Sequence, residues 1–290
     1  ALDFGISHPD KYKAWHSASN SIITLATKTE RALWEFCQLL DRKGQAYVPF
    51  YEPDVGYALT AIAIVPGERV KKLCSGIPLA GKNPDPEGAK ERLKATKEIV
   101  ANMLTCEQTS GQNMLQHGMD VKDHLCDLVA FLKDPSKELG HQWRLPSWFF
   151  PYASRIRDNL HSGFTLDRYA IMHDCGKPNV RVQSEGTDGK IATQYPGHAQ
   201  ASYEAWTKMS DDLEIGELIR RDMEIHLLKA EGIPEFCRDP KAACSLLLSG
   251  LAAIHSNAKR HPEGLGAVSF KIKWKHLEKR GMAICKFLFP

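Results

Sequence analysis

The sequence predicts a small α/β domain followed by a larger all-α domain. Before residue 80, stretches of strand character alternate with stretches of helical spacing, whereas after it apolar residues recur mostly with the period of a helix. A chain of 290 residues is long enough for two domains of ordinary size. We place the α/β domain at residues 1–82, a linker at 83–93, the helical domain at 94–262 and a basic C-terminal segment at 263–290.

The first domain is predicted to have the element order β-α-β-β-α. Its elements are a strand at 20–27, a helix at 28–44, strands at 45–52 and 58–65, and a short helix at 67–76. The first helix is amphipathic, because Leu33, Phe36 and Leu40 share one face, and Gly44 ends it.

The second domain is predicted to be a helical bundle with one hairpin inserted. Prolines and charges around Asp85 mark the linker that precedes it. The expected helices span about 94–108, 119–133, 165–175, 198–210, 214–230 and 240–258. Two short strands, at 180–183 and 190–195, flank a turn rich in Gly and Asp and so predict a β-hairpin between helices.

The composition excludes membrane and disulfide-rich classes. Hydrophobic residues make up 43% and charged residues 25% of the chain, which is typical of a globular protein. No apolar run approaches the roughly 20 residues of a membrane span, and the first residues lack the layout of a signal peptide. The eight cysteines form no Cys-x-x-Cys pair and mostly lie in apolar stretches, as reduced core residues do. We therefore expect a cytoplasmic protein without a membrane partner.

The end of the chain is basic. From Lys259 onward there are eight Lys or Arg residues against two Glu. This segment alternates apolar and basic residues and could contact a phosphate backbone. The other interpretation is the solvated surface of an edge strand or a helix.

Histidines cluster at positions where a metal site could be assembled. His124, His173, His198, His226 and His255 lie on or at the ends of segments predicted to be apolar helices. A buried imidazole needs a polar partner, and a shared divalent cation would satisfy several at once. Asp174, next to His173, would add a hard oxygen ligand. For each histidine taken alone, the alternative is a hydrogen-bonded residue of the core.

The segment 172–178, "MHDCGKP", resembles the His-Asp signature of HD-domain metal-dependent phosphohydrolases. The segment 117–125, "HGMDVKDHL", resembles the first-helix motif of that family. The predicted hairpin followed by "YPGHAQAS", 195–202, is most similar to the HD domain of bacterial CCA-adding tRNA nucleotidyltransferases. The resemblance covers residues 113–257.

The resemblance implies roles for individual residues. His124, His173 and Asp174 resemble ligands of a first metal, and His198 and His226 resemble ligands of a second metal or contacts of the scissile phosphate. The family supplies a late Asp from a final helix, and here His255 is the nearest candidate to replace it. His117 could be a ligand, a residue that supports one, or a residue at a helix start.

The same resemblance indicates which residues carry the reaction. Lys177 resembles the family lysine near the substrate phosphate, and we assign Arg168 to substrate binding as well. The candidate catalytic residues are then Asp174, Lys177, His198 and His226.

Residues 28–67 resemble the second half of a type 2 peptidyl-tRNA hydrolase domain. Glu52 or Asp54, together with Gly56 and Thr60, occupy the places of that family's acid-x-Gly loop and following strand. The lysine-bearing motif of that family is absent from the residues before the first predicted strand. We therefore expect this domain to bind tRNA or to form a homodimer through an open sheet edge rather than to catalyse. The alternative is an accessory layer that covers the helical domain.

Together these observations predict a metal-dependent phosphohydrolase or phosphodiesterase. One or two divalent ions (Mn, Mg, Co, Ni, Fe or Zn) would activate a water molecule against a phosphate ester of a nucleotide or an RNA end. A tRNA 3′ end and a 2′,3′-cyclic phosphate are candidate substrates. One alternative is a nucleotidase or cyclic-nucleotide phosphodiesterase that acts on free nucleotides. Another is a non-catalytic tRNA- or nucleic-acid-binding protein with a structural metal site.

Overall fold

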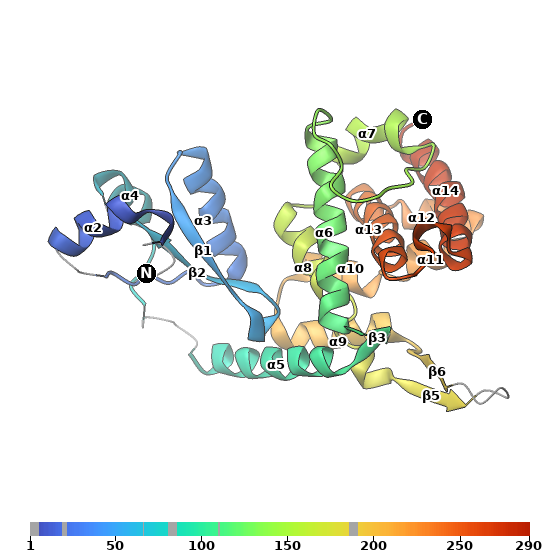
Figure 1. The fold of residues 1–290 in the computed structure, drawn as a ribbon, viewed down its shortest axis with the longest axis horizontal. Helices are drawn as coiled ribbons and strands as arrows, with labels where there is room; N and C mark the ends of the chain where they lie inside the picture. The colour runs from blue at the N-terminus through green and yellow to red at the C-terminus, as the bar shows by residue number, and fades with distance from the viewer. Residues whose placement is uncertain (1–5, 19–21, 66, 81–85, 110, 186–190) are drawn as a thin grey trace. The chain divides into compact units, whose positions relative to one another are not determined.

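Helices account for most of the computed structural model, and each sheet in the described part of the chain has two antiparallel strands (Figure 1). The structure describes residues 6–18, 22–65, 67–80, 86–109, 111–185 and 191–290. The chain divides into two units, Ala1–Lys97 and Glu98–Pro290. Among helices built from described residues, none combines the length and the apolar character that crossing a membrane requires.

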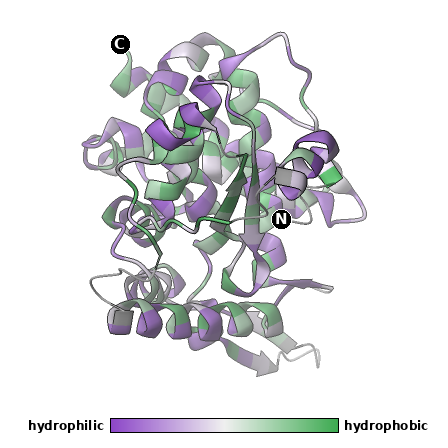
Figure 2. Cartoon of the chain, turned by 90° about the vertical axis from the view of Figure 1, so that its left-hand side faces the viewer, coloured by the Kyte–Doolittle hydropathy of each residue, from purple (hydrophilic) through white to green (hydrophobic). Residues whose placement is uncertain are grey.

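The first unit is built around one β-hairpin. Its elements are α2 (Pro9–Ala18), α3 (Glu30–Arg42), β1 (Tyr47–Glu52), the 3-10 turn η1 (Pro53–Val55), β2 (Ala58–Ile64), α4 (Glu68–Cys74) and the start of α5 (Pro86–Thr105). Thr29 caps α3 by accepting a hydrogen bond from the backbone N–H of Ala32. Helix α3 contacts β2 and buries Cys37 and Leu40, whereas its other side is polar. Figure 2 shows that the helices of the chain carry both hydrophilic and hydrophobic residues.

The strand expected at 20–27 does not form over its described residues, 22–27. Asn20 and Ser21 lie outside the described residues, and Leu25 makes only an isolated bridge to Leu79. Ile22 and Ile23 are 71% and 76% exposed, so this apolar run does not gain the burial that stabilises a strand. The described helices and strands of the unit therefore follow the order α-α-β-β-α, after which α5 begins. The strands expected at 45–52 and 58–65 are confirmed as β1 and β2.

The predicted linker is largely helical where it is described. Residues 83–85 lie outside the described residues, and 86–93 form the first turns of α5. This helix continues across the boundary between the two units, so the second unit begins within a helix.

The second unit is a helical bundle with two short β-hairpins. After α5 come β3 (Glu107–Thr109), β4 (Gln112–Asn113), α6 (Met114–Lys133), α7 (Phe149–Asp158), α8 (Gly163–Met172), η2 (Lys177–Val180), β5 (Val182–Glu185) and β6 (Ile191–Gln194). The rest consists of α9 (His198–Met209), α10 (Leu213–Arg220), α11 (Glu224–Leu227), η3 (Ala230–Gly232), α12 (Ile233–Phe236), α13 (Pro240–Lys259), η4 (Gly264–Gly266) and α14 (Val268–Leu288). The predicted hairpin is confirmed as β5–β6.

Helix α13 forms the centre of the bundle. It is buried along nearly its whole length, as expected of a helix that is apolar all round. Helix α6 contacts both α13 and α8, and α14 contacts α13 and α11 (Figure 1). The basic C-terminal segment is thus a helix, and it buries Phe270, Leu277 and Ile284 along one stripe.

Two glycines allow the helices around α8 to approach closely. A Cβ atom on Gly118 of α6 would lie 2.2 Å from the carbonyl oxygen of Ile171 in α8. A Cβ on Gly176 would lie 2.2 Å from the backbone of Ala201 and Ser202 in α9. The Ser202 hydroxyl accepts a hydrogen bond from the Gly176 N–H at 3.0 Å. These contacts place the beginnings of α6 and α9 against the end of α8.

Replacing Gly118 by Ala should destabilise the second unit, because the new methyl group would overlap the Ile171 carbonyl. We expect the free energy of unfolding in urea to fall by about 3 kcal/mol, the upper end for overpacking a core. The matched control is Gly266→Ala, whose Cβ would meet only the Cβ of Glu263 at 3.9 Å. That control should stay within about 0.5 kcal/mol of the parent. Equal stability of the two variants would contradict the close approach of α6 and α8.

Candidate metal centre

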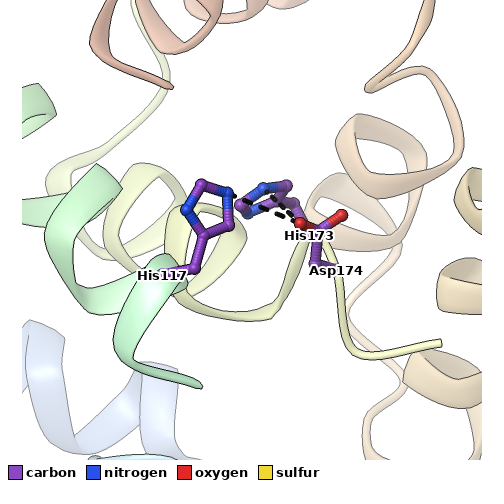
Figure 3. A group of neighbouring side chains, drawn as sticks. All are labelled: His117, His173 and Asp174. Carbon is purple, nitrogen blue, oxygen red and sulfur yellow. Dashed lines mark ion pairs between the residues drawn. The ribbon is translucent and has the colours of Figure 1, made fainter. Parts of the chain in front are cut away.

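His117, His173 and Asp174 come together where α6 and α8 meet (Figure 3). His117 lies in the first turns of α6, whose start is fixed by a capping box between Asn113 and Gln116. His173 caps the end of α8, and Asp174 follows it. One candidate ligand atom from each of the three lies within 4.8 Å of the others. Nε2 of His117 and Nε2 of His173 are 3.5 Å and 3.3 Å from Oδ2 of Asp174.

These three side chains are almost completely buried. The side chain of Asp174 is 2% exposed, and that of His117 is 3% exposed. Within the described part of the chain, Oδ1 of Asp174 and Nδ1 of His117 have no hydrogen-bond partner, whereas Oδ2 of Asp174 forms an ion pair with Lys177. Buried polar atoms of this kind are rare in folded proteins, and a metal ion is one of the groups that satisfies them. Two imidazoles and a carboxylate also form a donor set that suits divalent transition metals.

The electrostatics of the cluster favour an ionised carboxylate. Burial alone would raise the pKa of Asp174, but the charges of His173 and Lys177 overcome it and hold this pKa well below its usual range. Burial likewise opposes the charged form of His173, yet the attraction of Asp174 raises the pKa of His173 to about 9. Burial dominates at His117 and lowers its pKa to about 3, so this imidazole is neutral, the form that binds metals.

The ring of His173 is oriented by the backbone. Its Nδ1 donates to the carbonyl oxygen of Ala170 at 2.8 Å, which leaves Nε2 facing Asp174. Metal-binding histidines are commonly oriented by such a bond from the other ring nitrogen.

Lys177 adds a buried positive charge to the cluster. It is the first residue of η2, and its Nζ lies 2.7 Å from Oδ2 of Asp174 and 3.1 Å from Oε1 of Gln108. The ammonium group also lies 5.3 Å from the centre of the Tyr195 ring. Because an ammonium group can donate three hydrogen bonds, Lys177 can also contact an anionic ligand in the adjoining cavity.

A cavity of about 300 Å³ opens beside the cluster. His198, at the start of α9, has its Nε2 3.8 Å from Oδ1 of Asp174, and its Nδ1 bonds to the carbonyl oxygen of Tyr195. His226 of α11 lines the same cavity, and burial lowers its pKa, although Asp222 opposes this effect. The structure therefore brings His198 and His226 to the cavity that contains the His117, His173 and Asp174 cluster.

His124 lies elsewhere, contrary to its assignment as a first-metal ligand. It follows His117 by seven residues, which is two turns and about 10 Å along a helix. Its Nδ1 donates to the carbonyl oxygen of Asp120, and its ring stacks on His141 at 3.9 Å between centres. The residue of α6 that reaches Asp174 is His117, which the sequence left with three possible roles.

His255 cannot complete the site, because both of its ring nitrogens are already used. Nδ1 donates to the carbonyl oxygen of Leu251 at 2.8 Å, and Nε2 accepts a hydrogen bond from the backbone N–H of Arg144 at 3.1 Å. The ring packs against Trp143 and Phe270. The assignment of His255 as a ligand is therefore corrected: it joins α13 to the loop that precedes α7.

The remaining candidates also lie outside the cavity. Arg168 is 6% exposed, lies within α8 and does not line the cavity, contrary to its assignment to substrate binding. In the first unit, exposed Asp54 forms an ion pair with Lys97 at 2.7 Å. Glu52 ends β1, and Thr60 is exposed on β2.

Sequence reasoning missed several residues of the cavity wall. Lys273, His276 and Arg280 line the cavity from α14, and Asp222 lines it from the turn before α11. Oδ1 of Asp222 accepts a hydrogen bond from the Tyr169 hydroxyl at 2.5 Å. The spacing of the three α14 residues, three and then four positions apart, was the signal available in the sequence, since such residues share one face of a helix.

Comparison with known proteins finds no matching family model, no matching curated protein and no matching solved structure. The chemistry of the cluster must therefore be inferred from its own donor atoms, burial and charges. Those features support a site for a divalent metal ion, because a buried His-His-Asp group could hold one.

The two histidines of α6 provide a matched pair for testing metal binding. We expect His117→Gln to weaken the binding of Mn²⁺ or Zn²⁺ at least about 100-fold, because it removes a ligand. His124→Gln changes a buried imidazole on the same helix and should leave the affinity within about twofold, because its ring lies outside the group. Isothermal titration calorimetry measures both affinities. Equal losses in the two variants, or a loss confined to His124→Gln, would show that the wrong histidine has been assigned.

His255 should make stability depend on pH. Burial lowers its pKa from 6.5 to about 4, so protons bind the unfolded chain more tightly. The stabilisation is complete above pH 6.5 and is lost as the pH falls from 6.5 toward 4. Between pH 7.5 and pH 5.0, the parent should lose about 2 kcal/mol more unfolding free energy than His255→Gln. Identical urea midpoints of parent and variant across this range would refute the assignment of a neutral ring.

Proposed function

We propose that this chain is a metal-dependent phosphohydrolase that acts on a phosphate ester of a nucleotide or an RNA end. One observation carries the proposal: a buried His-His-Asp group and a lysine share a cavity with further histidines and with cations. An anionic carboxylate with imidazole ligands suits a divalent ion, and the surrounding cations suit a phosphate. The resemblance of residues 113–257 to HD-domain phosphohydrolases supports the same reaction, with His117 in the place first given to His124.

Different residues of the cavity would have different roles in the proposed hydrolysis. His117, His173 and Asp174 would hold the ion, which when bound lowers the pKa of a water molecule and polarises a phosphoryl oxygen. The remaining N–H of Lys177 would donate to a phosphoryl oxygen and so stabilise the charge that develops on it. His198 and His226 lie where they can bind the phosphate or transfer a proton to or from the reacting oxygen.

The substrate follows from the size and charge of the cavity. A volume of about 300 Å³ is at the small end for ligand sites and matches a ligand of nucleotide size. A nucleotide at the end of an RNA, such as a tRNA 3′ end or a 2′,3′-cyclic phosphate, meets this limit, as does a free nucleotide. The resemblance of the first unit to a tRNA-binding fold supports RNA, and the nucleotidase reaction is the alternative on the same site.

A metal-binding protein without catalysis is the second candidate, and one observation favours it. Helix α13 presents Ser249, Gly250 and Ala253 to the cavity and no carboxylate. Asp222 is the second carboxylate of the cavity wall, and Tyr169 already donates to it. A site with few carboxylate ligands could bind a metal, and a nucleic acid beside it, without turning over a phosphate ester.

Hydrolysis measurements separate the two candidates. We expect the protein to hydrolyse bis-p-nitrophenyl phosphate or p-nitrophenyl phosphate with one or more of Mn²⁺, Mg²⁺, Co²⁺, Ni²⁺, Fe²⁺ and Zn²⁺. Asp174→Asn should reduce kcat/KM at least about 1,000-fold, because it removes the charged ligand. Asp123→Asn, a change of the same kind at an exposed position of α6, should retain activity.

Two results would overturn the hydrolase. One is a protein that binds metal tightly but hydrolyses neither ester nor any member of a panel of nucleotides and RNA ends. The other is an Asp174→Asn variant with the activity of the parent. The first of these results would support the non-catalytic binding protein.

A further inference from the structure

We infer that α14 forms a second anion-binding subsite in the cavity, so that the ligand carries a phosphate besides the one that approaches Asp174 and Lys177. The cavity that contains His117, His173 and Asp174 is also lined by three residues of α14: Lys273, His276 and Arg280. The inference deepens the proposed function and rests on it for the role of the first phosphate. The binding of a second anionic group follows from α14 itself.

The three residues form a row along one side of α14. Their spacing of three and then four positions turns them onto one face, next to the stripe that buries Phe270 and Leu277. Helix α14 contacts α13 and α11, which carry other residues of the cavity wall. Docking of the apolar stripe therefore places the basic row at the cavity, with Lys273 and His276 exposed and Arg280 half-buried.

Lys273 and Arg280, the two permanent cations of the row, lack an ion pair in the part of the chain that the structure describes. The hydrogen bond of Arg280 goes from Nε to the carbonyl oxygen of Leu228 at 2.8 Å. That bond fixes the Arg280 side chain and leaves its terminal nitrogens as donors. A guanidinium group fixed in this way is well suited to a planar or tetrahedral oxyanion.

The two carboxylates of the cavity do not fully neutralise this row. Asp174 is paired with buried Lys177 at 2.7 Å, which leaves Lys273 and Arg280 against the single charge of Asp222, to which the neutral Tyr169 hydroxyl donates. Positive charge is therefore in excess at the α14 side of the cavity. Two separate groups of positive charge in a cavity of nucleotide size match a nucleotide with two phosphate groups.

A second phosphate can come from two sources that share this chemistry. It can be the other phosphate of a nucleoside bisphosphate, or the phosphodiester that joins the last nucleotide of an RNA to its neighbour. Adenosine 3′,5′-bisphosphate represents the first source. A dinucleotide with a terminal 3′-phosphate represents the second.

The test measures binding in EDTA, so that it does not depend on metal or on hydrolysis. By calorimetry, we expect the protein to bind at least one of these two-phosphate probes about tenfold more tightly than adenosine 5′-monophosphate or adenosine 3′-monophosphate. The double variant Lys273→Gln/Arg280→Gln should reduce this preference to about twofold or less. The matched control, Lys271→Gln/Lys279→Gln, removes the same charge from exposed positions of α14 outside the cavity and should keep the preference.

Arg280→Lys is a milder variant that separates a loss of binding from a folding defect. It keeps the positive charge but removes the guanidinium group that the bond to Leu228 holds in place. It should retain part of the preference, and thermal melts should show that each variant is folded. The tighter of the two probes identifies the source of the second phosphate. Equal affinity for one and two phosphates in the parent, or equal effects of the two double variants, would overturn the subsite.

The outcomes for the subsite and for the hydrolase are separate. If the parent hydrolyses p-nitrophenyl phosphate but shows no preference for two phosphates, the hydrolase stands and the subsite fails. If the preference is present and is lost only in Lys273→Gln/Arg280→Gln, but no ester is hydrolysed with any metal, the subsite stands and the hydrolase fails.

Discussion

The burial of the Asp174 carboxylate is the constraint on which the second unit depends. A carboxylate removed from water is costly unless nearby positive charge compensates it, and here its pKa nevertheless stays well below the usual range. Lys177 at 2.7 Å and His173 at 3.3 Å supply that charge. Both groups lie within three residues of Asp174 in the chain, so the end of α8 and the turn after it supply the compensation locally. The start of α6 adds the neutral ring of His117. Keeping the carboxylate buried also requires α6 and α9 to approach this segment closely.

Glycines, which have no side chain, allow the helices around Asp174 to approach one another closely. The missing side chain of Gly118 lets α6 lie directly against the Ile171 carbonyl. This contact brings His117 beside His173, the residue that precedes Asp174. Gly176 lets the first turn of α9 rest on the turn after α8, which brings His198 toward Asp174. Gly250 differs, because its Cβ would meet side-chain atoms, Cγ2 of Ile225 at 3.2 Å and Cε1 of His226 at 3.6 Å. At Gly118 and Gly176 a histidine reaches the cavity where two backbones approach closely, so the cluster of His117, His173 and Asp174 and the close packing have one cause.

This cause explains which parts of the site could be predicted from the sequence. His173, Asp174 and Lys177 could be identified because they lie in one short segment, whose local geometry holds them together. The choice between His117 and His124 could not be made, since both lie on one face of α6 and only the crossing point with α8 separates them. The same limit applies to the fold: β1, β2 and the β5–β6 hairpin are local pairings with turn signals, whereas the apolar run at 20–27 had no partner that its own residues could reveal.

The walls of the cavity differ in a way that favours a long anion over a compact one. The wall from α6 and α8 holds buried groups whose charges are already paired, so a ligand gains there only through Lys177 and through the metal ion that the cluster could hold. The wall from α14 carries Lys273 and Arg280, which are exposed and half-buried and form no ion pair within the described residues, so attraction there costs little desolvation. Between them α13 presents the small residues Ser249, Gly250 and Ala253 together with Ile254 and Asn257. The proposed ligand follows from this difference: a single phosphate would contact one wall at a time, whereas a nucleotide with two phosphates would contact both.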